Sequence, residues 1–184
     1  RVEFQTDHLP LNVAANGLPF ASRMQKPEPI LRPVNAADAV TVQTLVYGIL
    51  RSYGLEPDPA DTDADLADPA TFYRSGWFRV LELNNTIIGT VGLLPMEGNI
   101  WELRKMYLAS NHRGNGLGRQ MLAAALAEAR ARGACKIVLG TATVLKEAIG
   151  LYCSEGFVPS TEAHPAARCD QTWELILHER ATNN

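Results

Sequence analysis

The fold of this chain is decided by two short runs, Glu102-Leu103-Arg104-Lys105-Met106-Tyr107-Leu108 and Arg113-Gly114-Asn115-Gly116-Leu117-Gly118. The first run predicts a β-strand. The second predicts a glycine-rich turn into a helix over Leu117–Arg132, whose apolar residues recur at helical spacing. Gly133 then supplies the left-handed residue that commonly ends a helix. A strand, a glycine turn and a helix start in succession present backbone N–H groups to an anion.

The start of this helix carries an unusual charge. Helix starts normally favour Asp or Glu, because the unpaired N–H groups there make the end positive. Here Arg113 and Arg119 flank the turn, and no acidic residue follows until Glu128. We therefore expect a ligand to bring the negative charge, with three glycines letting the backbone approach it closely.

Two common phosphate-binding motifs do not fit this loop. A Walker loop ends in Gly-Lys-Ser/Thr, whereas this one ends in Gly118-Arg119-Gln120. A dinucleotide fingerprint needs a glycine at position 119. It also needs an acidic residue at the end of the next strand, where this chain has Leu139-Gly140-Thr141. Both motifs therefore fail at particular positions.

The loop does match the signature Arg/Gln-x-x-Gly-x-Gly/Ala, and at this point the chain resembles the GNAT (general N-acetyltransferase) superfamily. The matching residues are Arg113, Gly116 and Gly118, and the resemblance covers about residues 30–178. Three further pieces occur in the family's order. They are Arg32-Pro33-Val34, the Glu102–Leu108 strand, and Leu151-Tyr152-Cys153-Ser154-Glu155-Gly156-Phe157, which is similar to the family's Leu-Tyr-x-x-x-Gly-Phe element.

The resemblance implies an α/β (mixed α+β) fold. We expect a central mixed β-sheet of about seven strands, flanked by helices and splayed at the cofactor cleft, with the element order β-α-α-β-β-β-α-β-α-β-β. Residues 1–29 are expected to form an N-terminal extension or arm, and residues 30–184 a GNAT-like domain. The expected strands are 30–34, 77–83, 86–94, 100–108, 135–139, 157–160 and 172–178, and the expected helices are 36–53, 69–76, 117–132 and 143–155.

Composition limits the class of protein. The 184 residues carry a net charge of −3 without a basic stripe, so we expect no nucleic-acid partner. No apolar run reaches about 18 residues and no signal-peptide pattern is present, so we expect no membrane association. Cys135, Cys153 and Cys169 form neither a disulfide framework nor a zinc-binding pattern. A reduced, cytoplasmic protein without a metal is the simplest expectation.

Glu102 is the candidate general base. In the histone-acetylating branch of the family, the base is a glutamate four positions before the strand residue that matches Met106, and Glu102 occupies that place. The reaction needs a base because an alkylamine with a pKa of about 10.4 is protonated at pH 7. Alternation along the strand would put Glu102 on the same face as Met106 and Leu108. The alternative is a glutamate that pairs with Arg104 or another cation.

Tyr152 is the second candidate catalytic residue. In the family, this tyrosine lies near the cofactor sulfur and protonates the departing thiolate. The alternative is a tyrosine whose ring fills the core beside Phe157. The neighbouring Cys153 has no obvious His or Asp partner for covalent catalysis, so we expect a thiol that packs in its helix.

The resemblance also implies how acetyl-coenzyme A would bind. Backbone groups of Met106, Tyr107 and Leu108 would pair with the pantetheine arm, and one N–H would polarise the thioester carbonyl. An ordinary central strand is the alternative, and both can hold. The pyrophosphate would lie on the glycine turn, for which a tight turn with solvated arginines is the alternative. The residues assigned to this turn are Arg113, Gly114, Asn115, Gly116, Leu117, Gly118 and Arg119.

The acceptor is less well defined by the sequence. By resemblance, the loop with Glu56, Asp58, Asp61, Asp63 and Asp65 borders the acceptor pocket. An acidic rim would attract an ammonium group, but we favour a solvated loop. Arg168 and His164 could meet an acceptor carboxylate, although surface placement is favoured. Together these features weakly suggest a small amine or amino acid rather than a histone tail.

The sequence therefore predicts an acetyl-CoA-dependent N-acetyltransferase that acts on a primary amine by direct attack in a ternary complex. A non-catalytic acyl-CoA-binding regulatory module is the alternative from another class. Retention of both Glu102 and Tyr152 favours the enzyme, because a pure binder needs neither. The length of the acyl group stays open. A homodimer is common in the family, but nothing in the sequence fixes it.

Overall fold

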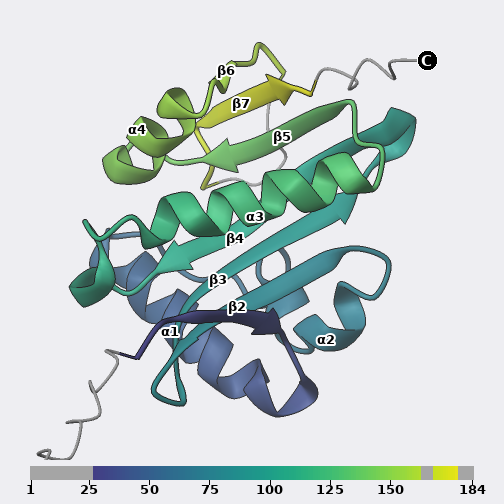
Figure 1. Cartoon of the computed structure of the whole chain (residues 1–184). Helices are drawn as coiled ribbons and strands as arrows, with labels where there is room; N and C mark the ends of the chain where they lie inside the picture. Colours follow the sequence, from purple (N-terminus) through teal and green to yellow (C-terminus); the bar gives the residue numbers. More distant parts are fainter. Residues whose placement is uncertain (1–26, 163–167, 178–184) are drawn as a thin grey trace, which may run out of the picture.

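The computed structural model describes residues 27–162 and 168–177, which form a seven-stranded sheet with helices on both faces (Figure 1). His164, His178 and most of the expected N-terminal arm lie outside these residues. The strand order is β1-β2-β3-β4-β5-β7-β6. Only β4 and β5 pair in parallel among these neighbours, so the sheet is mixed, as predicted.

The elements follow one another in the predicted order. The strands are β1 (Ile30–Pro33), β2 (Trp77–Leu83), β3 (Thr86–Pro95), β4 (Ile100–Leu108), β5 (Lys136–Thr141), β6 (Val158–Pro159) and β7 (Gln171–Ile176). The α-helices are α1 (Ala39–Ser52), α2 (Pro69–Phe72), α3 (Leu117–Ala131) and α4 (Lys146–Ser154). Short 3-10 turns lie at η1 (Ala36–Asp38), η2 (Ala64–Leu66), η3 (Glu97–Asn99) and η4 (Ser110–His112). No helix in this described part of the chain is long and apolar enough to cross a membrane.

The sheet separates two apolar cores. On one face α3 and α4 pack against the sheet, and α3 runs across this face in Figure 1. On the other face α1 and the segment around α2 enclose a smaller core. The predicted apolar stripe of α3 is buried in the first core through Met121, Leu122, Ala125, Leu126 and Ala129.

Local sequence explains several element boundaries. The β2–β3 hairpin turns through Asn84 and Asn85, both left-handed, as expected for a tight turn at the predicted place. Asp68 caps α2 by accepting a hydrogen bond from the N–H of Thr71. Gly133 has a φ of 78°, which confirms its role just after α3.

Other boundaries differ from the prediction. The helix expected from residue 36 becomes α-helical only at Ala39, after a 3-10 turn, and its buried stripe begins at Val42. The fifth strand begins at Lys136, and Cys135 before it is exposed. The last helix begins at Lys146 rather than at residue 143, because a turn that ends at Leu145 comes first.

The sheet splays open between β4 and β5, as predicted. These strands pair only through Ile100–Glu102 and Lys136–Val138. Past these residues β4 continues along β3, while β5 continues along β7 to Thr141. The carboxyl ends of two parallel strands therefore separate in the middle of the sheet and open a gap there.

A β-bulge interrupts β4 just beyond the last of these pairs. Opposite the stretch of β3 from Thr90 to Gly92, β4 has one residue more than its partner. Lys105 lies in this bulge with a φ of 51°, in the left-handed region. Such a conformation costs a side-chain-bearing residue about 1–2 kcal/mol, so its surroundings must compensate.

Candidate active site

A cavity of about 460 Å³ fills the gap between the separated ends of β4 and β5. Five parts of the chain build its wall: the end of α1, the end of β4, the glycine turn with the start of α3, the end of β5, and α4. The lining residues are Ile49, Tyr53, Met106, Tyr107, Leu108, Arg113, Gly114, Gly116, Gly118, Arg119, Met121, Gly140, Thr141, Leu145, Glu147, Ala148, Leu151 and Tyr152.

Most of the predicted site residues meet in this cavity. The three residues assigned to the pantetheine, five of the seven in the glycine turn, and Tyr152 all line it. Asn115, Leu117 and Glu102 do not. The sequence did not predict that Tyr53, directly after α1, would line this cavity. It also did not predict the contribution of Gly140 and Thr141 at the end of β5. The end of β5 could have been inferred, because it faces the predicted splay.

The glycine turn is built for exposed backbone amides. Gly114 and Gly116 have φ values of 77° and 78°, and an added Cβ would meet nothing within 4 Å at either position. The positive φ favours glycine at both positions, and no protein atom crowds them. Gly116 precedes α3 without any side-chain cap, and the first turn of α3 contains no acidic residue. The helix start therefore offers unsatisfied N–H groups and a positive dipole end to the cavity.

The two arginines of the turn have protein partners. Arg113 donates from Nε to the Leu108 carbonyl (2.9 Å) and from its guanidinium to the Tyr53 hydroxyl. Tyr53 in turn donates to Glu147 on α4 (3.1 Å), so three elements touch at the cavity mouth. Arg119 forms an ion pair with Glu155 (2.6 Å) and keeps 60% of its side chain exposed. The alternative of simply solvated arginines is therefore wrong for Arg113.

Tyr152 packs in the core and also lines the cavity, and its acid role stays a prediction. Its ring lies 5.6 Å from the ring of Phe157, centroid to centroid, and the residue is only 6% exposed. It also lines the cavity. Burial is the main cause that raises the pKa of Tyr152, with Tyr107 and Cys169 adding to it. Burial likewise raises the pKa of Tyr107 to about 12. Both phenols therefore stay protonated around neutral pH and can donate hydrogen bonds.

The thiol of Cys153 corrects one expectation. The sequence predicts that it packs in its helix, but the residue is exposed. The reason is the orientation of α4, which turns Tyr152 toward the core and Cys153 to solvent. Cys153 is not among the residues that line the cavity.

The bulge puts Glu102 on the opposite face from Met106 and Leu108, so the expected alternation is wrong. Leu103 before the bulge and Met106 and Leu108 after it all pack in the α3 core. Glu102 therefore faces the α1 side of the sheet. There its carboxylate lies 3.5 Å from the guanidinium of Arg104, and its side chain is 15% exposed. This ion pair is the alternative considered for Glu102, and it leaves the general-base role a prediction.

The loop between α1 and α2 brings two buried carboxylates to the bulge. Asp63 is fully buried, and it accepts two hydrogen bonds from Arg168 (both 2.6 Å) and one from Lys105 Nζ (2.7 Å). Asp65 is 2% exposed. One of its oxygens lies 3.2 Å from Lys105 Nζ, and the other accepts a hydrogen bond from the Tyr73 hydroxyl (2.6 Å).

These contacts correct two expectations about the acceptor side. A solvated acidic loop describes Glu56 and Asp61, which are exposed, but it is wrong for Asp63 and Asp65. Surface placement is also wrong for Arg168, whose side chain is 15% exposed. The physical reason is mutual: a buried charge needs an opposite charge, and these residues supply it to one another.

We expect acid to weaken the fold through Asp63. Burial would raise its pKa, but hydrogen bonds from Arg168 and Lys105 outweigh burial and hold the pKa at about 2. An unfolded Asp titrates near about 3.9, so this carboxylate adds stability above that pH, and the contribution is lost as the pH falls toward 2. Urea unfolding should show the free-energy difference between the wild type and Asp63→Asn shrinking by about 2 kcal/mol between about pH 5 and about pH 2.5. A difference that does not change with pH would contradict this assignment.

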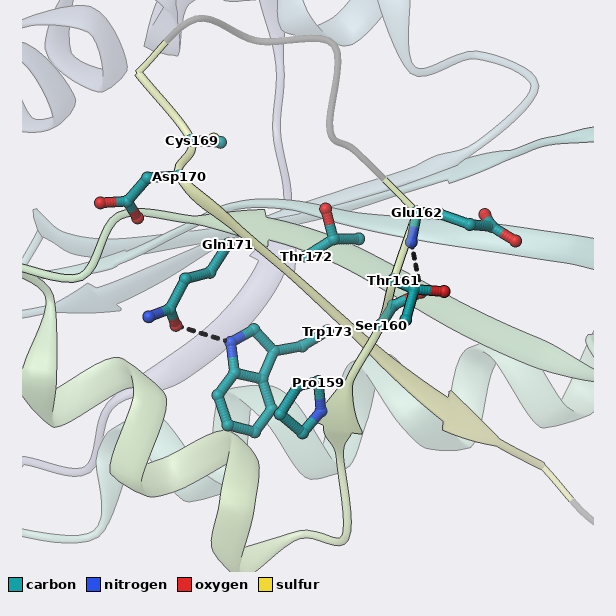
Figure 2. Close-up of a pocket in the computed structure, with 9 residues that line it drawn as sticks. All are labelled: Pro159, Ser160, Thr161, Glu162, Cys169, Asp170, Gln171, Thr172 and Trp173. Carbon is teal, nitrogen blue, oxygen red and sulfur yellow. Dashed lines mark hydrogen bonds between the residues drawn. The ribbon is translucent and has the colours of Figure 1, made fainter.

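A second cavity, of about 440 Å³, lies beside β7 (Figure 2). Residues from Pro159 to Glu162 and from Cys169 to Trp173 line it. The indole N–H of Trp173 donates to Gln171 (3.0 Å), as Figure 2 shows. Cys169 lines this second cavity and not the first.

Comparison with known proteins agrees with the fold. Residues 44–157 match the model of the acetyltransferase (GNAT) family, which is more than half of the chain. The chain therefore belongs to the GNAT acetyltransferase family. It is 31% identical over 141 residues to an uncharacterized N-acetyltransferase of Escherichia coli K12, YjgM, covering 70% of this chain and 81% of that protein.

Solved structures show the same fold at low sequence identity. An acetyltransferase of the GNAT family from Staphylococcus aureus Mu50 has a TM-score of 0.76 at 19% identity, covering 82% of this chain and all of that one. The PaiA N-acetyltransferase from Thermoplasma acidophilum, solved in complex with coenzyme A, has a TM-score of 0.65 at 16% identity. That comparison covers 82% of this chain and 99% of that one. The family and the Escherichia coli relative support N-acetyltransferase activity.

Proposed function

We propose that this protein transfers the acetyl group of acetyl-coenzyme A to a primary amine, by direct attack of the amine in a ternary complex. The observation that carries the proposal is a cavity that runs from the uncapped start of α3 to the gap between β4 and β5 and to Tyr152. One end can take a diphosphate, and the other can take a thioester.

The cavity walls fit the two chemically distinct parts of coenzyme A. The amides of the glycine turn and the dipole of α3 would hold the pyrophosphate. The Met106–Leu108 segment has no β5 partner, because pairing between these strands ends at Glu102. The pantetheine amides would take the place of that strand and pair with the backbone of this segment.

Two steps would follow on the bound thioester. As the amine attacks, the carbonyl oxygen gains negative charge, and a backbone N–H of the Met106–Leu108 segment would stabilise it. The carbon–sulfur bond then breaks and leaves a thiolate. Tyr152, kept protonated by burial, would donate its hydroxyl proton to that sulfur or hydrogen-bond to it.

The amine must lose a proton before it can attack. Glu102 lies on the α1 side of the sheet, and Asp63 of the acidic loop pairs with Arg168. By resemblance to the family, the acidic loop borders the acceptor pocket. We propose that Glu102 accepts the amine proton directly or through one water. The ion pair with Arg104 would orient its carboxylate for this task.

We propose that the acceptor is a small primary amine or an amino acid. The contacts of Arg168 limit how it could bind the carboxylate of an amino acid. Arg168 already donates both terminal nitrogens to Asp63, so an acceptor carboxylate would have to compete with that buried ion pair. A panel of polyamines, amino acids, aminoglycosides and lysine or N-terminal peptides, assayed by coenzyme A release, tests this proposal. Turnover with peptides alone would contradict it. Acetyl-CoA binding without turnover on any amine would favour a regulatory binding module.

We expect Gly116→Asp to raise the KM for acetyl-CoA at least about tenfold. The backbone of residue 116 would have to keep a φ of 78° with a side chain attached, and the Asp carboxylate would place a negative charge where the pyrophosphate would bind. Gly116→Asn is the matched control, because Asn has nearly the same shape, tolerates a left-handed backbone and carries no charge. It should raise KM much less. Equal KM values for wild type and Gly116→Asp would contradict pyrophosphate binding at this turn.

A further inference from the structure

Lys105 occupies a backbone position that usually belongs to glycine. It lies in the bulge of β4 with a φ of 51°, and the left-handed residue of such a bulge is typically Gly. Lysine has no local means of favouring this conformation, since its side chain does not bond to its own backbone as that of Asn or Asp can. Contacts from elsewhere in the fold must therefore hold it.

Three oxygen atoms hold the side chain of Lys105 from the loop between α1 and α2. Its Nζ donates to the Thr62 carbonyl (2.7 Å) and to Asp63 (2.7 Å), and it lies 3.2 Å from Asp65. Only 3% of this side chain is exposed. A buried ammonium with three oxygen partners cannot leave without stranding its charge and theirs, so the side chain fixes where its own Cα lies.

The backbone of Lys105 is held as well. Its carbonyl accepts a hydrogen bond from the hydroxyl of Thr90 on β3 (2.7 Å), and Thr90 is fully buried. Asp63 is itself held by Arg168, which precedes β7. The α1–α2 loop, β3 and the segment before β7 therefore all converge on one residue of β4.

The bulge sets the orientation of the part of β4 that lines the cavity. Met106 comes directly after Lys105 and is the first residue of β4 to line the cavity. Because of the extra residue, Met106 and Leu108 face the α3 core while Tyr107 packs toward the α1 core. Without the bulge, every side chain and N–H of this segment would turn to the other side.

We propose that Lys105 is a positioning residue for acetyl transfer. Its buried contacts with Thr62, Asp63 and Asp65 hold the left-handed bulge, and the bulge aims the backbone N–H groups after it at the thioester carbonyl. This inference rests on the proposed function and deepens it by naming what sets the geometry of the oxyanion site. Lys105 does not line the cavity, so it would act only through the backbone that follows it.

The test compares Lys105→Ala with Lys105→Gly. Both variants remove the same buried contacts, but only glycine adopts a left-handed backbone without strain. With an accepted amine, kcat should fall about tenfold in Lys105→Ala and stay within about threefold of wild type in Lys105→Gly. The Kd of coenzyme A should rise in Lys105→Ala, because the pantetheine would pair with the same segment of β4, and it should stay near the wild-type value in Lys105→Gly. Equal kcat values for the two variants, whether high or low, would overturn the proposal.

Two further measurements keep the test decisive. Thr90→Val removes the hydrogen bond to the Lys105 carbonyl at constant shape, and it should lower kcat about threefold. An unchanged kcat would count against the proposal. Crystal structures of the two Lys105 variants need no activity. The glycine variant should keep a positive φ at residue 105, and the alanine variant should lose it. If the wild type transfers no acetyl group, the proposed function fails, while these structures still test what holds the bulge.

Discussion

Replacing Tyr152 by Phe should lower kcat about 10- to 100-fold while leaving the KM for acetyl-CoA nearly unchanged. The loss is bounded because a thiol with a pKa of about 8.5 is already a tolerable leaving group. The raised pKa of the buried Tyr152 makes full proton transfer to sulfur uphill. Its hydroxyl would therefore contribute by donating a hydrogen bond to the developing thiolate, so we expect a reduced rate rather than a complete loss.

The substitution by Phe isolates the contribution of the hydroxyl, because it removes that group and keeps the ring. The contact with Phe157, at 5.6 Å between ring centroids, should survive, so the melting temperature should change little. Steady-state kinetics with saturating amine and a melting curve of the same preparation make the comparison. A kcat equal to that of the wild type would contradict the role of Tyr152 as a proton or hydrogen-bond donor to sulfur. A lower kcat with a much lower melting temperature would point to packing instead.

Glu102→Gln should lower kcat/KM for the amine about 100-fold at pH 7, and the deficit should shrink as the pH rises. General-base catalysis matters most where the amine is protonated. Near the amine pKa of about 10.4 the free base forms without help. The Gln side chain is close to Glu in size but cannot accept a proton. The pH dependence of kcat/KM in wild type and variant is the measurement.

The ion pair with Arg104 supplies the control for this prediction. Arg104→Gln removes a partner of Glu102 but keeps the carboxylate. If Glu102 is the base, Arg104→Gln should retain the wild-type rise of kcat/KM with pH, although it should lose stability because Arg104 also contacts Asp65 and the Thr62 carbonyl. If Glu102 serves only to pair with Arg104, the two variants should lose activity equally and at every pH.

The parts of the site that depend on local sequence could be predicted. The left-handed residues at Gly114 and Gly116, the uncapped start of α3 and the cavity-lining Tyr152 follow from short motifs, because turn and helix-start chemistry is encoded within a few residues. The splay between β4 and β5 came from the family resemblance rather than from any residue pattern, and the strand pairing confirms it.

The acceptor side could not be predicted, because its contacts are long-range. Asp63 and Arg168 are 105 positions apart, and neither has a neighbour that marks it as buried. Lys105 does not mark the bulge by its residue type, because it is neither Gly nor Asn. The run does break strict alternation, with two polar residues in succession at Arg104 and Lys105, but the prediction for this strand assumed regular alternation through them. That bulge is why the predicted face of Glu102 is wrong. A charged residue buried by a distant opposite charge leaves no periodic signal.

Direct transfer of the acetyl group from acetyl-coenzyme A to an amine at this cleft can be tested in a single turnover. Rapid mixing of the enzyme with acetyl-CoA, with and without an accepted amine, measures the release of coenzyme A in the first turnover. We expect no release above hydrolysis without the amine, and release together with N-acetyl product when the amine is present. A burst of coenzyme A equal to the enzyme concentration without any amine would contradict direct transfer and would indicate an acyl-enzyme instead.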